Sequence, residues 1–394
     1  MNKKTRSPLF HITKRDALPW YKSWGIRAAA ILLALIVCSI ITTTMTGENP
    51  LQVYATIFNG SFGSPRKVWV LLQNIAMLLC IALAVTPAFK MRFWNIGAQG
   101  QVLMGALMAS MCMIKLAGKV PNALLVVIEL FAAITGGALF AYIPAFFKSK
   151  WNTNETLFTL MMNYIAVFVV TYFTDVWRGS KSSLGTINPN TEAGWLSFVT
   201  GNKTIDTFTK TYMNQQVLIP MVVVIFLMIL MHFYLKYFKH GYELTVVGDS
   251  ISTARYTGIN VGHVMRRTLF LSGAICGLIG FFYVSCFDHT ISGSTSGGYG
   301  FTAVIVCWLS NFNPFIMVIY SFLIIFLQKG ARNLSNVSYA PALNEYSTEF
   351  LIFLVIIALL LVTFFVRYRF QVKPNSKKLV RTLTKGLDLE GGAL

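Results

Sequence analysis

Residues 239–267, KHGYELTVVGDSISTARYTGINVGHVMRR, form a polar interval between two long apolar runs. Such an interval is expected to lie in water rather than in lipid. Asp249 and Ser250 are residue types that cap helices, and Gly258 is the type that ends them in the left-handed conformation. We therefore predict a helix of about two turns that ends at Tyr256 and has nothing of its own to pack against. Such a helix is typical of a segment held by another protein; a merely structured loop is the alternative.

The composition is that of a polytopic membrane protein. Of the 394 residues, 55% are hydrophobic and 12% are charged, whereas about a quarter of the residues in a soluble domain are charged. The net charge of +19 does not indicate nucleic acid, because the basic residues lie in short loops and tails beside apolar runs. Anionic lipid headgroups are the nearer partner there. We expect a chain that lies in the lipid bilayer and binds no nucleic acid.

Ten apolar runs are expected to cross the membrane, and most of them approach the ~20 residues that a bilayer needs. The predicted fold class is an all-α membrane protein with a transmembrane domain at 28–366 and tails at 1–27 and 367–394. The expected spans are 28–45, 68–89, 96–114, 123–147, 156–174, 217–238, 268–287, a short piece at 301–311, 314–328 and 350–366.

The interval 175–216 is rich in Thr, Asn and Ser, and we expect it to be an external loop. It divides the spans into two sets of five. Because the number per set is odd, the second set begins from the opposite side, which is the topology of an inverted repeat. Placing both tails and the alternate loops on one side puts 23 of the 33 basic residues there. By the positive-inside rule, both termini and the interval 239–267 are then cytoplasmic.

Each set of spans has a glycine-rich interruption after its second span, NIGAQGQ at 95–101 and SGGYGF at 296–301. Glycine and amide groups at membrane depth are costly beside lipid, but they are tolerated where broken helices line a cavity. Amides and an aromatic face also suit the binding of nucleobases and sugars. We therefore predict a solute pathway at the two interruptions, with turns at the membrane surface as the alternative.

Four motifs, in family order, resemble those of ATP-binding-cassette permeases of the branched-chain amino acid, simple sugar and nucleoside type. FWNIGAQGQ is similar to the FNIGAEGQ-type signature of the nucleoside-leaning branch, although Gln99 stands where that signature has an acid. A role that needs a carboxylate at Gln99 is therefore not implied. The resemblance covers about 55–365. The motifs are FWNIGAQGQ at 93–101, NETLFTLMMNYIA at 154–166, the residues 241–260 of the polar interval, and GGYGFTAVIV at 297–306 followed by Asn313-Pro314.

The resemblance implies a permease subunit of an importer in the plasma membrane, for nucleosides or alternatively for a simple sugar such as ribose. Its implied partners are a cytoplasmic ATPase that holds ATP and Mg²⁺, an extracytoplasmic substrate-binding lipoprotein, and a second permease subunit that is either a copy or a relative of this chain. The predicted pathway residues are Asn95, Gln99, Gln101, Asn163, Tyr299 and Phe301. Asn95, Gln99 and Phe301 are expected to face the solute channel because the two glycine-rich interruptions bring polar groups and an aromatic surface to membrane depth. The residues implied to couple to the ATPase are Gly241, Gly248, Ala254, Arg255, Tyr256, Gly258 and Ile259.

Catalytic chemistry is not indicated by any motif of the chain. There is no G-x-x-x-x-G-K-[ST] phosphate loop, so we expect no ATP hydrolysis by this chain. There is no nucleophile elbow or HExxH motif, and the six cysteines lie in or beside apolar runs without metal-site spacing. We predict neither a cofactor nor a metal in this chain. An ion-coupled secondary transporter is a rival that the scarcity of intramembrane acids disfavours, and a membrane enzyme is a second rival.

Three further groups of residues allow specific expectations. Glu129 lies in an apolar helix near the start of a span, and we expect its carboxylate to reach the headgroups. Gly273, Gly277 and Gly280 form a small-residue helix face, which predicts close helix packing. The pair 288–289, Asp-His, is expected in a loop at the outer rim.

Overall fold

The computed structural model describes residues 10–14, 19–46, 49–196, 215–335, 355, 357–359, 361–362 and 368–372. The chain divides into two compact units, one of Met1–Thr56 with Ala331–Leu394 and the other of Ile57–Gly330. Most of the expected span 350–366, of the C-terminal tail and of the first nineteen residues lies outside the described residues, as does 197–214 of the expected external loop.

The first unit contains helix α1 (Trp20–Thr46), the start of helix α2 (Pro50–Phe62) and a short antiparallel sheet. Strand β1 (Phe10–Lys14) pairs with strand β2 (Tyr368–Val372). This short pairing was not predicted, because it joins two tail segments that apolar periodicity alone does not relate. The membrane-spanning part of the described residues is helical, as predicted. Helix α2 was also not predicted, since its 13 residues are too short for a membrane span.

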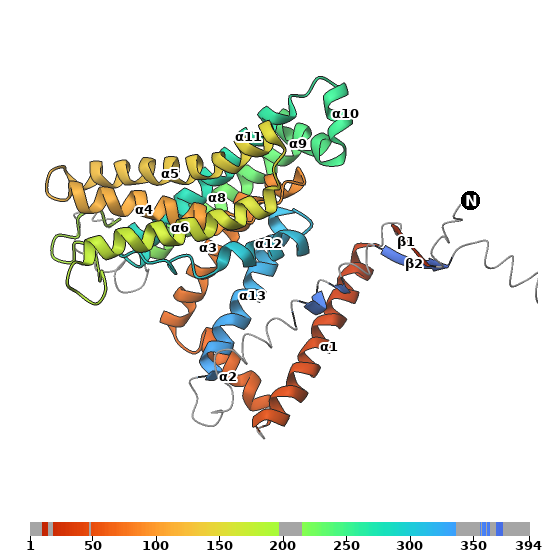
Figure 1. Ribbon diagram of the computed structural model, residues 1–394. Helices are drawn as coiled ribbons and strands as arrows, with labels where there is room; N and C mark the ends of the chain where they lie inside the picture. Colours follow the sequence, from red (N-terminus) through yellow and green to blue (C-terminus); the bar gives the residue numbers. More distant parts are fainter. Residues whose placement is uncertain are drawn as a thin grey trace, which may run out of the picture. The chain divides into compact units, whose positions relative to one another are not determined.

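The second unit is a bundle in which α3, α4, α5, α6, α8 and α11 run side by side (Figure 1), with α9 and α10 at one end. The helices begin at good capping residues, such as Ser64 before α3, Asn154 before α6 and Asn260 before α11. The elements are α3 (Pro65–Lys90), α4 (Ala98–Leu116), α5 (Asn122–Trp151), α6 (Glu155–Arg178), α8 (Gln215–Tyr237), α9 (Lys239–Asp249), α10 (Ile251–Tyr256), α11 (Val261–Phe282), the π-helical turn η1 (Tyr283–Phe287), α12 (Tyr299–Leu309) and α13 (Pro314–Ser335), whose last residues belong to the first unit.

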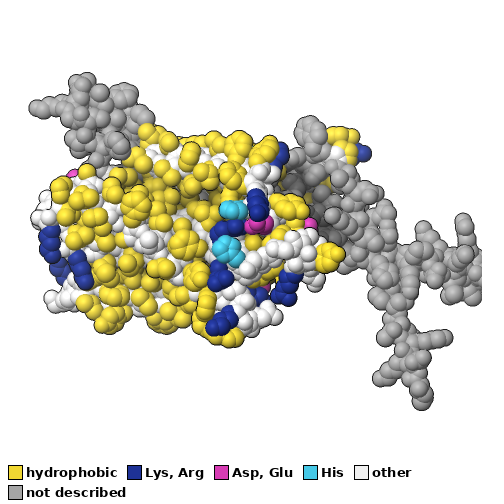
Figure 2. Space-filling view, turned by 90° about the horizontal axis from the view of Figure 1, so that it is seen from above, with side chains coloured by type: hydrophobic (Ala, Val, Ile, Leu, Met, Phe, Trp, Pro, Cys, Tyr) yellow, Lys and Arg dark blue, Asp and Glu magenta, His cyan; other side chains and the backbone are white. Residues whose placement is uncertain are grey.

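Six helices of the described residues are long and apolar enough to cross a membrane. Figure 2 shows a predominantly hydrophobic face with Lys and Arg side chains toward its two ends, as expected of a bundle that lies in lipid. The predicted total of ten spans and its inverted repeat are not confirmed by this number. The six are Pro65–Lys90, Asn122–Trp151, Glu155–Arg178, Val217–Tyr237, Val261–Phe287 and Pro314–Asn333.

The core of the bundle is the packing of α11 between α4 and α5, and small residues make it possible. A methyl group added at Gly105 of α4 would lie 2.5 Å from the Cα of Gly277, and one added at Gly137 of α5 would lie 2.7 Å from the Gly277 nitrogen. Gly273 and Gly280 are packed against backbone in the same way. The predicted role of this face in close helix packing is confirmed, because no side chain larger than hydrogen fits between these backbones.

Candidate functional site

The two glycine-rich interruptions are real breaks between helices, and they meet in space. The chain turns after α3, with Arg92 at φ +58°, before α4 begins at Ala98. The second break passes through Gly298 at φ +75° into α12. Gly300 lies against the first break, since a Cβ atom there would be 2.6 Å from the backbone nitrogen of Gln99. Two segments far apart in the sequence therefore form one site.

Asn95 holds the first break to α11. Its buried side chain accepts hydrogen bonds at Oδ1 from the Gly97 nitrogen and from Gln101 Nε2, both at 3.1 Å. Its Nδ2 donates to Ser272 Oγ at 3.3 Å. Both Asn95 and Gln101 are buried in this network. Asn95 therefore shapes the start of α4 and fastens it to a neighbouring helix.

Asn163 of α6 holds the same break from the other side. Its Oδ1 accepts from the Gly100 nitrogen at 2.8 Å, and its Nδ2 donates to the Ile96 carbonyl at 2.9 Å. One turn earlier, the Thr159 hydroxyl accepts from the Ile96 nitrogen at 3.2 Å. These contacts satisfy backbone groups that the end of one helix and the start of the next would otherwise leave unpaired.

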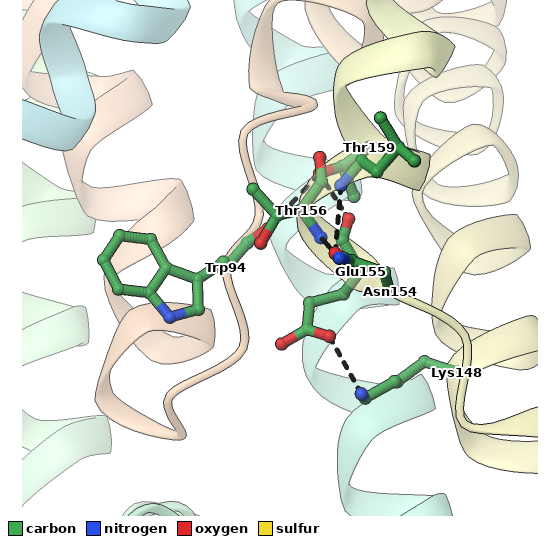
Figure 3. A network of polar contacts seen from close by, with 7 residues as sticks. Trp94, Lys148, Asn154, Glu155, Thr156 and Thr159 are labelled. Atoms are coloured by element: carbon green, nitrogen blue, oxygen red, sulfur yellow. Dashed lines mark hydrogen bonds and ion pairs between the residues drawn. The ribbon is translucent and has the colours of Figure 1, made fainter.

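The first turn of α6 is itself fixed to α5 (Figure 3). Asn154 caps this helix by accepting at Oδ1 from the Thr156 nitrogen at 3.1 Å, and Glu155 forms a 2.9 Å ion pair with Lys148 near the end of α5. Figure 3 also shows Trp94, whose carbonyl lies within hydrogen-bond distance of the Thr159 hydroxyl at 3.3 Å. The first break is thus tied to α5, α6 and α11.

The six predicted pathway residues fall into two groups by exposure. Asn95, Gln101, Asn163 and Tyr299 are buried; the Tyr299 hydroxyl donates to Asn74 Oδ1 of α3 at 2.6 Å. Phe301 is 43% exposed. Gln99 is half-buried, and its Oε1 has no hydrogen-bond partner among the described residues.

Trp94 was not predicted as a site residue, although it lies within the FWNIGAQGQ motif. Its ring is 42% exposed and stacks on Trp308 of α12, with centroids 5.4 Å apart. Phe89 packs edge-on against both indoles. Packing of α12 on α3 brings Trp94 and Trp308 together, so spacing in the sequence gives no signal for this aromatic cluster.

The short helix predicted in the polar interval is confirmed as α10. Ser250 accepts at its hydroxyl from the Thr253 nitrogen, and the helix ends at Tyr256. Gly258 has φ +79°; its nitrogen donates to the Arg255 carbonyl at 3.1 Å, while the Ile259 nitrogen donates to the Ala254 carbonyl at 2.9 Å. This pair of bonds is a Schellman motif, the expected left-handed helix end.

The first half of the polar interval, for which no helix was predicted, forms the helix α9. Asp249 is its last residue and does not cap α10. Leu244 and Val247 are buried, as are Gly241 and Gly248. The polar composition concealed this helix, because only one narrow face of it is buried.

Helix α9 is fastened to three spans. Glu243 pairs with Arg267 of α11 at 2.9 Å, and a Cβ atom at Gly241 would lie 2.5 Å from the Tyr234 carbonyl of α8. Gly248 packs directly on the carbonyl of Lys90, the last residue of α3. In α10 only Ala254 is buried, whereas Arg255 is exposed and Tyr256 is 93% exposed. An anchored helix thus carries an exposed one.

Glu129 is buried, which corrects the prediction that it reaches the headgroups. Its Oε2 accepts from Ser285 Oγ of η1 at 2.8 Å, and Gly194 packs against its Oε1. Its side chain points into the bundle, where the loop after α6 covers it. The loop is held by a stack of Trp195 on His289, with centroids 3.8 Å apart.

Comparisons with known proteins place the chain in a family of membrane transport proteins. The family model described as branched-chain amino acid transport system / permease component matches residues 70–360. A nucleoside ABC transporter permease protein, NupB, of Lactococcus lactis is 25% identical over 83% of this chain and 88% of its own. The guanosine ABC transporter permease protein NupP of Bacillus subtilis is 25% identical over 79% and 87%. The glucose ABC transporter permease protein TsgB13 of Haloferax volcanii is 25% identical over 90% and 92%. No solved structure matches the chain significantly.

Proposed function

Because the chain belongs to the branched-chain amino acid transport system / permease component family, we propose that it is the membrane subunit of an ATP-driven nucleoside importer. Two of the relatives described above are named for nucleosides or guanosine. The relative named for glucose favours a simple sugar as the second candidate. The chain is a transport subunit, and ATP is hydrolysed by a separate subunit that holds ATP and Mg²⁺.

The observation that carries the proposal is the connection between α10 and the first break. Helix α10 presents Arg255 and Tyr256 to solvent, which suits docking by a cytoplasmic ATPase. Helix α9, directly before it, rests through Gly248 on Lys90, where α3 ends and the break begins. A displacement of α10 by the ATPase would therefore act on the break through backbone contacts.

The pathway is proposed to lie between two permease subunits, so its lining must be exposed in the single chain. Phe301 and Trp94 meet this condition. Gln99 meets it only in part, because it is half-buried and its Oε1 is buried. Aromatic faces stack on nucleobases, and an amide supplies hydrogen bonds. The buried residues do not line the pathway but hold the two breaks in place through hydrogen bonds. They are Asn95, Gln101, Asn163 and Tyr299.

The remaining assembly follows from this function. The second permease subunit is a copy or a relative of this chain, and a substrate-binding lipoprotein delivers the nucleoside from outside. Both termini are cytoplasmic in the plasma membrane, and ten spans form two inverted sets of five. The domain bounds are those predicted from the sequence, with 175–216 outside and 239–267 on the ATPase side. The meeting of two equivalent breaks supports the repeat.

Uptake by a reconstituted system tests the function. Proteoliposomes containing the chain, its ATPase and the lipoprotein should accumulate labelled guanosine with ATP, and should not do so with a non-hydrolysable analogue. Preferential uptake of ribose would show that the substrate is a simple sugar and not a nucleoside. Accumulation driven by an ion gradient without ATP would contradict the proposal.

Labelling in intact cells tests the topology. Cysteines placed at the exposed positions Ser252 in α10 and Ser182 after α6 should respond oppositely to an impermeant reagent. The Ser182 site should be labelled from outside, and the Ser252 site should be labelled only after the membrane is opened. External labelling at Ser252 would reverse the proposed orientation.

A further inference from the structure

A basic cavity lies beside the exposed helix α10, between the end of α5 and the first turn of α11. Its volume is about 800 Å³. Lys148 and Lys150 of α5, Arg255 of α10 and Arg266 of α11 line it, and among the described residues no Asp or Glu does. The transport function proposed above makes no use of this cavity as a binding site.

The charge of the cavity is only partly neutralised by its surroundings. Lys148 forms the ion pair with Glu155, which lies outside the lining. Arg266 donates from Nε to the Gly262 carbonyl at 3.2 Å, which holds its guanidinium at the wall. The 22-residue helix α11 begins at Val261, also in the wall, and its N-terminus adds partial positive charge. The cavity therefore favours an anion.

The aromatic residues at the end of α5 indicate the depth of the cavity in the membrane. Trp151 is 55% exposed, and the ammonium group of Lys150 lies 4.8 Å from its ring centroid and 5.8 Å from that of Phe146. Exposed Trp beside Lys at the end of a span is typical of the headgroup region of a bilayer. The anion thus lies at the level where lipid phosphates are.

The wall of the cavity is apolar as well as basic. Phe146, Ile251 and Met265 line it together with the cations, and Ile251 is 45% exposed. A small hydrated anion gains nothing from contact with apolar side chains. A lipid does, because its phosphate lies next to its glycerol and acyl carbons. Basic pockets between spans on the cytoplasmic side are known to suit anionic headgroups.

We propose that this cavity binds the headgroup of an anionic phospholipid of the inner leaflet, with its phosphate between Lys150 and Arg266 and its acyl chains beside α5. The proposal requires this end of the bundle to face the cytoplasm, but it does not depend on the transported substrate. Because Arg255 and the exposed helix α10 border the cavity, the bound lipid lies next to the surface on which the ATPase is proposed to dock.

Lipid retention by the purified full-length chain tests the proposal. The double variant Lys150→Gln/Arg266→Gln is compared with Lys236→Gln/Lys239→Gln, which removes the same charge from residues next to this end of the bundle but outside the cavity lining. Each is placed in nanodiscs of phosphatidylcholine with labelled phosphatidylglycerol, extracted mildly and examined by native mass spectrometry. Wild type and control should retain phosphatidylglycerol, whereas the double variant should retain roughly tenfold less.

Two further comparisons separate the proposal from misfolding and from other occupants. The charge-preserving variant Lys150→Arg/Arg266→Lys should retain the lipid, whereas loss there equal to that of the Gln variant would overturn the headgroup assignment. Equal retention by the double variant and the control would also overturn it. So would displacement of the lipid by inorganic phosphate at millimolar concentration, or its complete loss when the ATPase binds, which would assign the cavity to an acidic protein surface.

These outcomes are distinguishable from failure of the transport proposal, because lipid retention by the variants is measured without substrate, ATP or partner subunits, and the ATPase is added only in the displacement comparison. A chain that transports a sugar instead of a nucleoside would still be expected to retain phosphatidylglycerol.

Discussion

Gly300 of α12 and Gln99 at the start of α4 are in direct backbone contact: a Cβ atom at Gly300 would lie 2.6 Å from the Gln99 nitrogen. This contact makes the two helix breaks a single structural unit. Any movement of one break must therefore displace the other or open a gap between them. The relation explains why glycine is found at this point of the second break, since any side chain would separate α12 from α4.

Substitution Gly300→Ala should separate the two breaks. Overpacking of this kind costs roughly 1–3 kcal/mol, and we expect a lower melting temperature together with a loss of uptake. The control is Gly262→Ala, where an added methyl group makes an ordinary contact of 3.5 Å with Ser149. If Gly300→Ala melts and transports like the control, the breaks do not act as one unit.

Asn95 and Phe301 should respond differently to substitution, because one is buried and the other exposed. Asn95→Leu removes the acceptor of two hydrogen bonds, which should lower the free energy of unfolding by about 1–3 kcal/mol. Phe301→Ala should leave the melting temperature unchanged and raise the KM for nucleoside. Thermal unfolding in detergent and concentration-dependent uptake separate the two effects. Wild-type transport by Phe301→Ala would remove Phe301 from the pathway, and a wild-type melting temperature for Asn95→Leu would show that its hydrogen bonds do not hold the break.

The sequence was sufficient to predict features that depend on local chemistry. The capped helix ending at Tyr256, the left-handed Gly258 and the break before Ala98 all follow from residue types and their order. It was insufficient wherever the outcome depends on a distant partner. Asn163 meets Gly100 only through packing of α6 on α4, and Trp94 meets Trp308 only through packing of α12 on α3.

Glu129 shows the same limit in the core. Its distance from the helix start was compatible with headgroup contact, but Ser285 and the loop after α6 enclose it. Because Gln keeps an acceptor for the Ser285 hydroxyl, Glu129→Gln should keep most of the stability. Glu129→Leu leaves that donor unpaired and should cost on the order of 1–3 kcal/mol. Equal melting temperatures for the two variants would show that the bond contributes nothing measurable.

The loop after α6 should loosen as the pH falls. Burial lowers the pKa of His289 from 6.5, against opposing effects of a backbone hydrogen bond and of Glu192. The unfolded loop therefore binds more protons as the pH falls below about 6.5, and the stack on Trp195 loses stability there, whereas above that pH the contribution is constant. Burial raises the pKa of Asp288, which acts in the opposite direction.

Hydrogen exchange measures this effect. The nitrogens of Ile187 and Leu196 donate to the carbonyls of His289 and Ser285, so peptides covering 185–196 should exchange faster at pH 5.5 than at pH 7.5. His289→Gln should remove most of the difference, since it leaves Asp288 in place. The histidine has no such role if the pH dependence persists unchanged in that variant.

The last prediction concerns the end of α10. Gly258 has φ +79° with open space around it, so a side chain there meets no steric obstacle and acts only through the backbone. Val resists a positive φ, at a cost of about 1–3 kcal/mol, and should redirect the chain that leaves α10. Asn tolerates this conformation far better and provides the matched control.

We expect Gly258→Val to insert into the membrane and its bundle to melt like that of the wild type. ATPase association, substrate-stimulated hydrolysis and uptake should fall together in this variant, whereas Gly258→Asn should keep most of all three. The charge reversal Arg255→Glu, on the exposed part of α10, should weaken ATPase association without any backbone change. Transport by a secondary transporter would be unaffected by these substitutions, because it binds no ATPase. Unchanged assembly, hydrolysis and uptake in both Gly258→Val and Arg255→Glu would therefore remove α10 from the coupling surface.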